Sequence, residues 1–513
     1  MWARFFLPSI TDLVFILLLI SLTYGVLAPR LLGDSDIGWH IRDGQNIVET
    51  HAIPHVDPFS STMAGRPWYA WEWLYDAAIG LIYNRAGLNG VVFASALIIA
   101  STLAFVFRFS ILRGGSVPVT VVLFVLCAMS SSIHFLARPH VVGWLITVVW
   151  FWILDTATLS GQSRRLFWLP PLMVLWTNVH AGFVTGLILV GMFFAAEVLN
   201  SFTPSLATRQ RGRKNSVTLA GVLVLSALAS LVNPYGFQLH RHVYGYLTNR
   251  FFMQHIDEFR RPIFSGLPEQ AFVLLLAMTL VAVVVNRKAL RWSDLLVVMF
   301  SAFTGLYAAR NLPIASMFLV MIAAPLLSRE ASASHKESAI SRVAARMRAF
   351  GARATGSELR FRTHLWPIMA VLVSTWICSQ HGSFLGKQVM NARFDPEKLP
   401  VKAADVMAAR GIREPVFTTD SWGGYLIYRL YPDEKVVVDD RHDLYGEAYL
   451  REYLKVLHVT PGWQQVLDNQ NVNLILLPAK SKLGDSLRST ESWRNVYEDK
   501  TSVMFERESK EGR

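Results

Sequence analysis

The stretch GDSDIGWHIRDG, residues 33–44, follows the first long apolar run of the chain, Leu13 to Leu32. That run carries one charge, Arg30 near its end, and it is long enough to cross a bilayer as a helix, which needs about 20 residues. Two carboxylates, Asp34 and Asp36, therefore stand where a membrane helix emerges into water. Since many similar runs follow, the sequence predicts a polytopic α-helical membrane protein with acidic chemistry in its first external loop.

The composition also favours a membrane protein. Of the 513 residues, 52% are hydrophobic and only 17% are charged, whereas about 25% of an ordinary soluble domain is charged. In such a chain the net charge of +12 indicates basic cytoplasmic loops beside anionic lipid rather than nucleic-acid binding. Cys127 and Cys378 both lie in apolar runs, so no disulfide framework is predicted. The first run is longer than a signal-peptide core and lacks a small-residue cleavage site, so we expect it to remain as the first span.

Apolar runs of spanning length recur along the chain and predict, with the first, about eleven transmembrane helices. The middles of these runs carry no Asp, Glu, Lys or Arg, which disfavours an ion-coupled transporter, because such proteins need ionisable groups at the midplane. The further runs cover residues 88–110, 116–137, 140–160, 166–180, 182–200, 216–234, 270–286, 293–309, 311–328 and 364–381.

Charge places the N-terminus in the cytoplasm. In that orientation the cytoplasmic loops hold clusters of Arg and Lys, whereas the short external turns hold only Arg138 and Arg310, as the positive-inside rule requires. The basic segment 329–363 is then a cytoplasmic linker, either flexible or lying as a helix on the membrane surface. Residues 1–381 form the transmembrane domain, and the larger external segments are the first loop with its interfacial helices (33–75), a middle loop (235–268) and the C-terminal region (382–513).

The C-terminal region differs in character from the rest. Short β-like runs at 416–419, 435–439 and 473–477 alternate with helical patterns at 446–458 and 461–468, so residues 382–513 are predicted to form a small extracytoplasmic α/β domain. The string VVVDDRHD (436–443) ends one of these runs, and Asp420 follows another. Strand ends of α/β domains often carry binding groups, but Asp–Arg pairing that only holds the domain together explains the string equally well.

Candidate catalytic side chains gather in the first loop. Asp36 and His40 are four residues apart, so a helix places them on one face. Glu72 lies among the interfacial tryptophans of RPWYAWEWL (66–74). Carboxylates at this level can coordinate a divalent cation or accept a proton from an attacking hydroxyl. The alternative is that Asp34 and Asp36 only cap the interfacial helix.

Two outer turns add candidate binding residues. Arg138 in LARPH and Arg310 in ARNLP end predicted spans, where a guanidinium is costly without a partner and suited to bind phosphate with two donors. Both could converge with His140 on a lipid phosphate, or they could simply snorkel to the headgroups. In WTNVHAG, Asn178 and His180 have no charged neighbours in sequence; they either line a pocket or satisfy backbone groups freed by the turn.

The middle loop carries a weaker signal. His255 and Glu258 are three residues apart and could bind a metal, but no further ligand spacing supports such a site, so a solvated loop is the favoured interpretation. The sequence holds no P-loop, dinucleotide fingerprint, C-x-x-C or H-E-x-x-H motif, and nucleotide-driven chemistry therefore has no support.

As a set, GDSDIGWHIRDG, RPWYAWEWL, LARPH, WTNVHAGF and ARNLP resemble the GT-C superfamily of polytopic membrane glycosyltransferases. The resemblance covers residues 1–381. In the C-terminal region 382–513, called the tail below, the strings GGYLIYRL and VVVDDRHDLYG resemble an uncharacterised bacterial branch with a C-terminal soluble domain. It implies a GT-C-like fold, a sugar donor carried on polyprenyl phosphate, and an acidic residue in the first external loop that activates the acceptor or holds a metal.

Transferred to this sequence, the resemblance makes Asp36, with Asp34 assisting, the catalytic residues and the possible ligands of a divalent cation, Mg or Mn. The second acidic motif of oligosaccharyltransferase-type members is not evident at 137–140, which leaves metal dependence open. The tail contains no WWD-like string, so protein N-glycosylation is not predicted. The residues expected to bind substrate are His40, Glu72, Arg138, His140, Asn178, His180 and Arg310.

The resulting hypothesis is an enzyme of the bacterial cytoplasmic (inner) membrane that moves a hexose or pentose from a polyprenyl-phosphate donor to a glycan, lipid or protein acceptor on the extracytoplasmic face. Two other classes stay open: a non-catalytic flippase or export component for lipid-linked glycans, and a scaffold for envelope assembly. The partners expected are membrane lipids and the lipid donor, without nucleic acid. The hypothesis requires Asp36, Arg138 and Arg310 to face one cavity open to lipid.

Overall fold

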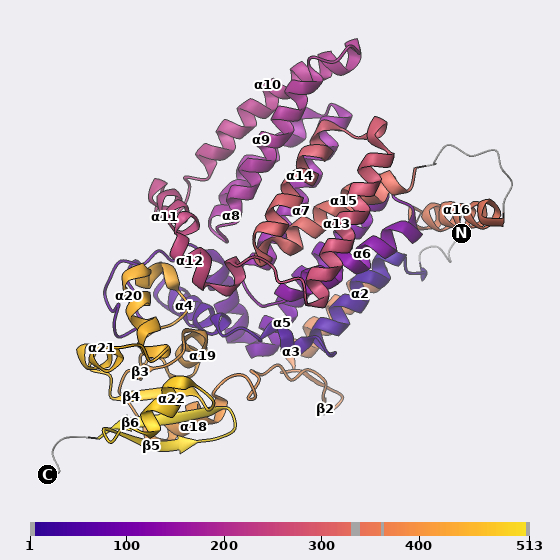
Figure 1. Ribbon diagram of the computed structural model, residues 1–513. Coiled ribbons are helices and arrows are strands. Elements are labelled where there is room, and N and C mark those ends of the chain that lie inside the picture. The colour runs from indigo at the N-terminus through magenta and orange to yellow at the C-terminus, as the bar shows by residue number, and fades with distance from the viewer. Residues whose placement is uncertain (1–5, 330–338, 361–363, 509–513) are drawn as a thin grey trace.

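The computed structural model describes residues 6–329, 339–360 and 364–508. Within them the chain is mainly helical, and the strands are confined to the C-terminal part (Figure 1). From the N-terminus to the end of the bundle, the α-helices are α2 (Ile10–Thr23), α3 (Ala28–Leu31), α4 (Asp36–Thr50), α5 (Trp73–Leu112), α6 (Val117–Ser131), α7 (His140–Ser160), α8 (Leu169–Thr177), α9 (Phe183–Asn200), α10 (Leu206–Ala229), α11 (Phe237–Thr248), α12 (Arg250–His255), α13 (Leu267–Val285), α14 (Trp292–Tyr307), α15 (Leu312–Leu327), α16 (Ala339–Glu358) and α17 (Leu365–Ser379).

Short 3₁₀ turns extend or connect several of these helices, namely η1 (Ser132–His134), η2 (Ser163–Trp168), η3 (Asp257–Phe259), η4 (Arg287–Ala289) and η5 (Ala309–Asn311). Among the described residues, six helices are long and apolar enough to cross a membrane, and three apolar helices, α2, α14 and α17, are shorter. The six are Trp73–Leu112, Val117–His134, His140–Ser160, Phe183–Asn200, Leu267–Val285 and Ala309–Leu327. The number of crossings, about eleven from the sequence, stays a prediction.

Two of the expected runs differ from the structure. The opening run, Leu13 to Leu32, was expected to be one span, but α2 ends at Thr23 and the chain turns before the short helix α3. Pro29 sits in the first turn of α3, where proline starts a helix rather than continuing one. The run at 166–180 gives α8, which has only nine residues and follows a 3₁₀ turn.

Helix α15 occupies the interior of the bundle, packed against α5, α6, α13 and α14 (Figure 1). Its side chains from Leu312 to Ala324 are buried on nearly every side, as expected for a helix that is apolar all round. The chain enters α15 through η5, which contains Arg310. The buried helix therefore fixes the position of that guanidinium at the edge of the bundle.

Helix α4, which contains most of the opening motif, is held between α5 and the tail. It crosses α5 where Gly44 meets Gly80: a Cβ added to Gly44 would lie 1.8 Å from the backbone oxygen of Asp76. On its other side, a Cβ on Gly38 would lie 2.3 Å from the backbone oxygen of Gly424. Only glycine permits such backbone contacts, and they press the side chains of α4 against both neighbours.

The C-terminal residues build a four-stranded sheet in the order β3-β4-β6-β5, in which β3 and β4 are parallel and the other pairs antiparallel. The strands are β3 (Val416–Phe417), β4 (Leu474–Pro478), β5 (Trp493–Glu498) and β6 (Ser502–Arg507), and a separate hairpin joins β1 (Ser383–Phe384) to β2 (Lys387–Gln388). The accompanying helices are α18 (Val401–Arg410), α19 (Asp420–Leu430), α20 (His442–Leu457), α21 (Trp463–Asn469) and α22 (Lys482–Arg488). The domain boundary at 381/382 stays a prediction.

Within this sheet the expected strand at 435–439 is wrong: Val436 makes only isolated bridges, to Val416 and to Ser60 of the first loop. The hairpin of β5 and β6 was not predicted. The helical patterns at 446–458 and 461–468 correspond to α20 and α21.

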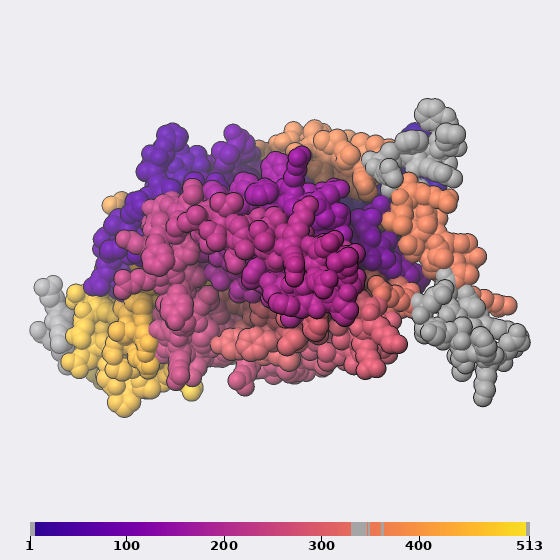
Figure 2. All heavy atoms as spheres, turned by 90° about the horizontal axis from the view of Figure 1, so that it is seen from above, coloured from indigo at the N-terminus to yellow at the C-terminus, as the bar shows by residue number. Residues whose placement is uncertain are grey.

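The C-terminal sheet and α16 lie at opposite ends of the molecule in both views (Figures 1 and 2). Helix α16 is attached to the N-terminus of α2 by Glu358, whose carboxylate accepts the backbone N–H of Ile10 at 2.7 Å and lies 3.1 Å from Arg108. Of the expected linker 329–363, residues 330–338 and 361–363 lie outside the described residues.

Replacing Gly44 with Ala should destabilise the protein, because the added Cβ would force α4 away from α5. Overpacking of this kind costs about 1–3 kcal/mol. The matched control is Gly221→Ala in α10, where nothing lies within 4 Å of the added Cβ and where helix propensity should add about 1 kcal/mol. Thermal unfolding in detergent measures both; a Tm for Gly44→Ala equal to that of the control would contradict the packing.

Candidate active site

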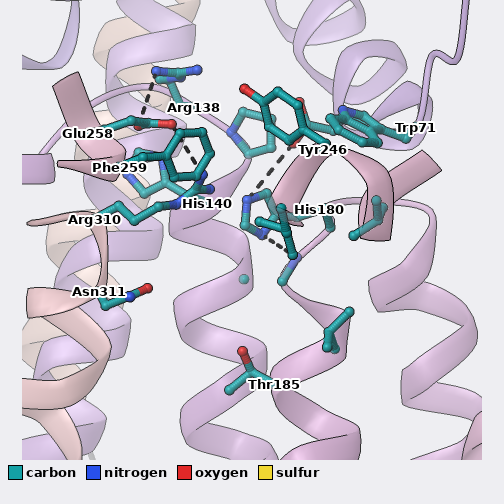
Figure 3. A pocket seen from close by; sticks show the side chains of 18 of the residues that line it. Trp71, Arg138, His140, His180, Thr185, Tyr246, Glu258, Phe259, Arg310 and Asn311 are labelled. Carbon is teal, nitrogen blue, oxygen red and sulfur yellow. Dashed lines mark hydrogen bonds and ion pairs between the residues drawn. The ribbon is translucent and has the colours of Figure 1, made fainter. Parts of the chain in front are cut away.

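A cavity of about 430 Å³ opens among the first loop, the ends of α7, α9, α14 and α15, and the tail. Charged and aromatic side chains surround its upper part, and it continues downward between the helices, where Thr185 and Asn311 lie in Figure 3. The deeper walls are apolar or carry hydroxyls, from residues including Thr147, Ile188, Phe300 and Ile314. Of the residues predicted from the sequence, those lining the cavity are Asp36, Glu72, Arg138, His140, His180 and Arg310.

Arg138 connects several carboxylates at the top of the cavity. Its Nη1 donates to Asp34 Oδ2 at 2.8 Å, its Nη2 pairs with Asp36, and Glu258 Oε2 lies 3.9 Å from Nη1. Glu258 also pairs with Arg310, at 3.3 Å, so it lies between the two guanidiniums (Figure 3). The two isolated outer arginines therefore face one cavity, and each already has a carboxylate partner.

Glu258 is the first functional candidate that the sequence analysis placed wrongly. It was expected in a solvated loop, whereas its side chain is 28% exposed and is paired with both arginines. Burial alone would raise the pKa of Glu258, but Arg310 and Arg138 outweigh it and hold that pKa well below its usual range. Arg310 in turn lies over the ring of Phe259, 4.4 Å from its centroid. This wall of the cavity thus carries fixed charges of both signs.

Three carboxylates meet on the other side of Arg138. Asp34 and Asp36 come from the first loop and Asp440 from the tail, and each offers an oxygen within 4.8 Å of the others. Burial, followed by the charge of Asp34, raises the pKa of Asp440 to about 7. One oxygen of Asp36 and one of Asp440 are buried without a hydrogen-bond partner among the described residues. Asp34 also caps α4, since its Oδ1 accepts the backbone N–H of Asp36 at 3.1 Å.

Arg441 fastens the tail to the first loop. Its Nη1 lies 2.8 Å from Asp57 Oδ1 in the first loop, its Nη2 lies 2.7 Å from Asp439 Oδ2, and the side chain is only 3% exposed. The guanidinium lies over the rings of Trp68 and Phe59, at 4.8 and 5.2 Å. Burial would raise the pKa of Asp57, but Arg441 outweighs it and lowers that pKa. This contact places the neighbouring Asp440 in the site.

Backbone hydrogen bonds join the same two segments. The N–H of Ser61 donates to the carbonyl of Val436 at 2.9 Å, and the hydroxyl of Thr62 donates to the carbonyl of Val437 at 2.6 Å. The N–H of Val437 donates to the carbonyl of Val416 in β3. Residues of the first loop therefore pair with the segment around Val436, which in turn pairs with the edge strand β3 of the C-terminal sheet. Asp439 and Arg441 thus hold the two segments together, as one interpretation of VVVDDRHD expected, and Asp440 lines the cavity. A binding role for this string stays a prediction.

Glu72 lies between two histidines. Its Oε2 is 3.9 Å from Nε2 of His40 and its Oε1 is 4.0 Å from Nε2 of His180. Burial raises the pKa of Glu72 to about 8, against the opposing charge of Arg138. Burial also lowers the pKa of His180 to about 3, so that imidazole is neutral. His180 thus has no charged neighbour in the sequence but lies beside the carboxyl group of Glu72 in the fold.

Sequence comparisons give no match: no protein-family model and no curated protein sequence matches this chain. Solved structures do match. The oligosaccharyltransferase AglB of Archaeoglobus fulgidus, tethered to an acceptor peptide with the NVT sequon, is 13% identical, covers 92% of this chain and 69% of its own, and gives a TM-score of 0.55. AglB in complex with an inhibitory peptide and a dolichol-phosphate is 12% identical, covers 92% of this chain and 69% of its own, and gives a TM-score of 0.52. AglB with Zn and sulfate is 11% identical, covers 92% of this chain and 68% of its own, and gives a TM-score of 0.51.

The chain has the GT-C fold. The fold predicted from the motifs is thereby confirmed.

On this GT-C scaffold the remaining predicted residues occupy different places. His140 lines the cavity and its Nε2 lies 2.9 Å from the carbonyl oxygen of His134. Asn178 instead accepts from Trp73 Nε1 and donates to the carbonyls of Val174 and Val232, each at 2.8 Å.

Asn178 thus ties the α8–α9 turn to its surroundings and is not among the residues lining the GT-C cavity. His40 lies behind Glu72 rather than in the opening. Asp420, the other tail carboxylate noted in the sequence, pairs with Nε2 of His442 at 2.9 Å. The residues that the prediction missed, Asp440 and Glu258, occur in segments already noted as polar, but no spacing in the sequence relates them to Asp36.

Replacing Arg441 with Met should loosen the tail from the first loop, because it leaves Asp57 and Asp439 buried without their cation. Removing one partner of a buried ion pair costs about 3–5 kcal/mol. Hydrogen exchange at the amides of residues 61 and 437 should speed up accordingly.

The matched control for this variant is Arg429→Met, whose pair with Asp405 is exposed and should contribute less than about 1 kcal/mol. Adding Asp57→Asn to Arg441→Met should cost less than the sum of the single changes, because the two side chains interact directly. Unchanged exchange in Arg441→Met, or strict additivity with Asp57→Asn, would contradict this role.

Proposed function

We propose that the protein is a glycosyltransferase of the cytoplasmic membrane, which moves a sugar from a polyprenyl-phosphate-linked donor to an acceptor on the extracytoplasmic face. The observation that carries this proposal is the convergence of Asp36, Arg138 and Arg310 on one cavity. That cavity continues between apolar helices, so a lipid phosphate can reach the arginines while its hydrocarbon chain stays among apolar side chains. The GT-C fold supports the same class of reaction, and the AglB structure with a dolichol-phosphate is a precedent for a lipid phosphate on this fold.

The positions of the basic linker and of the site at opposite ends of the molecule support the proposed orientation in the membrane. Helix α16, within the basic linker, lies at the end away from the C-terminal sheet and from the site (Figure 1). If the basic linker faces the cytoplasm, as the positive-inside rule requires, the site faces the extracytoplasmic side. Sugars carried on lipid phosphates are the donors that this location calls for. The sugar and the acceptor, whether glycan, lipid or protein, are not specified by these features.

Arg138 and Arg310 are proposed to bind the donor phosphate. Guanidiniums present parallel N–H donors that match phosphate oxygens, and both groups already occupy a wall of the cavity. During transfer the bond between the anomeric carbon and the phosphate oxygen breaks, and its electron pair stays on the phosphate. Donors fixed in place before the reaction stabilise that growing charge without reorganising. The carboxylates of Asp34, Asp36 and Glu258 hold the arginines in position beforehand.

The three carboxylates also fit a divalent cation. Asp34, Asp36 and Asp440 present oxygens close together, and the unpartnered oxygens of Asp36 and Asp440 are buried. Oxygen donors of this kind suit Mg²⁺ or Mn²⁺, and AglB was solved with Zn and sulfate. A cation there would be held by these residues and would supply positive charge for the departing phosphate. Asp36 is then a ligand and an ion-pair partner, which makes it a poor proton acceptor.

The test uses the purified full-length protein and a panel of farnesyl-phosphate donors carrying radiolabelled mannose, glucose, galactose or arabinose. With water as the acceptor, the wild type should release free sugar and farnesyl phosphate from one of these donors. Asp36→Asn should lower the rate by about 100-fold or more, as loss of a group that stabilises the transition state does. Chelation should lower the wild-type rate, and Asp440→Asn should raise the Mn²⁺ concentration needed for half-maximal rate.

The matched control is Asp485→Asn, whose carboxylate is exposed on α22 and pairs only with Arg488 among the described residues; its rate should equal that of the wild type. Unchanged turnover in Asp36→Asn and Asp34→Asn would end the assignment. Binding of the donors without any release of sugar would instead favour a flippase or export component.

A further inference from the structure

A row of buried titratable side chains lies behind Glu72, away from the arginines. His40 and Asp43 lie on α4 and Asp76 on α5, and none of the three is exposed to solvent. His40 Nδ1 is 2.5 Å from Asp76 Oδ1, and its Nε2 faces Glu72 Oε2 at 3.9 Å. The close crossing of α4 and α5 at Gly44 brings these side chains together. Of this row only Asp76 lines the cavity, as Glu72 does in front of it.

The contact with Asp76 bears on the tautomer of His40. Burial, followed by the charge of Arg138, lowers the pKa of His40 well below its usual value, so the imidazole is neutral. In the tautomer with Nδ1 protonated, the Nδ1–H donates to Asp76 and a lone pair is left on Nε2. That nitrogen is buried and has no hydrogen-bond partner among the described residues. A carboxylate behind an imidazole fixes its orientation and raises the basicity of the opposite nitrogen.

Asp43 continues the row beyond Asp76. Neither of its carboxylate oxygens has a hydrogen-bond partner in the described part of the chain. Burial raises the pKa of Asp43 to about 7, although Arg441 opposes the shift. The carboxyl groups of Asp43 and Asp76 interact with each other. Because two neighbouring buried carboxyls cannot both ionise at moderate cost, the pair is expected to keep one proton. The row can therefore accept a proton on His40 Nε2 at one end and hold one on Asp76 or Asp43 at the other.

We propose that Glu72 is the catalytic base that takes the proton of the acceptor hydroxyl, and that His40, Asp76 and Asp43 form a buried row that receives protons from it. This inference rests on the proposed function. The acceptor oxygen forms its bond to the anomeric carbon while the bond from that carbon to the phosphate oxygen breaks toward the phosphate. The hydroxyl proton goes to a carboxylate oxygen of Glu72. Once the 3.9 Å gap between Glu72 Oε2 and His40 Nε2 closes to hydrogen-bond distance, Nε2 takes that proton while the Nδ1 proton moves to Asp76. The imidazole therefore stays neutral, and one proton returns to solvent after product leaves.

Glu72 suits this role better than Asp36 because of its partners. Asp36 pairs directly with Arg138, and a carboxylate held by a guanidinium binds protons weakly. Glu72 contacts two neutral histidines instead, and its raised pKa makes its ionised form a strong base. The other titratable and charged groups that face it are Tyr75, Asp76, Arg138, Glu258, Arg310 and Asp443.

The test is the pH profile of sugar release from the farnesyl-phosphate donors. Since the pKa of Glu72 is raised to about 8, its base form increases as the pH rises through that value, and the wild-type kcat should rise with it. Glu72→Gln should lose about 100-fold or more in kcat and the rising limb, with little change in the donor KM. Glu72→Asp should restore part of the rate. His40→Gln should displace the limb, which loss of packing alone would not do.

The matched controls are Glu397→Gln and His458→Gln, which change exposed side chains of the tail and should leave the profile unchanged. A second measurement needs no turnover: infrared difference spectra across a pH titration should show a carboxylic acid that ionises near pH 8 in the wild type and is missing in Glu72→Gln. This separates the two proposals.

A wild type that releases no sugar would remove the proposed function and the base role with it, while the infrared band would show only that Glu72 ionises near pH 8. A wild type that turns over, with Glu72→Gln keeping the rate and the limb, would overturn the inference and leave the proposed function standing. Loss of the limb together with the infrared band would support both.

Discussion

The guanidinium of Arg441 is buried between Asp57 of the first loop and Asp439 of the tail, and it lies over two aromatic rings of the first loop. Charges this deeply buried persist only when paired and hydrogen-bonded. Segments almost 400 residues apart are therefore held in one arrangement, and Asp440 is held beside Asp34 and Asp36. The site depends on this contact because neither segment alone assembles the three carboxylates.

The charges around the cavity suit a reaction that ends with an anion. Arg138 and Arg310 face a larger number of carboxylates, namely Asp34, Asp36, Glu258 and Asp440. Burial, followed by the charge of Asp34, raises the pKa of Asp440, and the excess of negative charge favours a cation. Glu72 stands apart from this network, between neutral imidazoles. The groups proposed to bind phosphate thus lie apart from the group proposed to take a proton, as distinct roles in one site usually require.

Much of the fold could be predicted from the sequence because its signals are local. Apolar runs fix helices such as α7, α9 and α15, and the motifs around Asp36, Arg138 and Arg310 indicated both the GT-C fold and the wall of the cavity. Other features depend on tertiary contacts. The opening helix ended early, at Thr23. Val436 pairs with Ser60 of a distant loop instead of lying in a full strand.

The site was predicted only in part for the same reason. Asp440 and Glu258 reach the site because distant parts of the chain fold back onto it, and no residue spacing in the sequence reveals such contacts. The His40–Asp76 contact requires two helices that touch through Gly44, and a single glycine in a sequence does not reveal which helix will pack against it. Asn178 was predicted to bind substrate because it lies in an outer turn, but its side chain donates a hydrogen bond to the backbone carbonyl of Val174, just before that turn. Local patterns therefore indicated which residues are polar and near the membrane surface, while packing decided which of them meet.

The proposed chemistry depends most on the two outer guanidiniums receiving the phosphate of a lipid in this cavity. A cryo-electron microscopy structure of the full-length protein in nanodiscs with undecaprenyl phosphate and Mn²⁺ tests this most directly. We expect phosphate density in contact with Arg138 and Arg310, metal density among Asp34, Asp36 and Asp440, and the lipid chain between the helices that line the cavity. Phosphate bound elsewhere, with Arg138 and Arg310 still paired only to their carboxylates, would contradict the proposed chemistry.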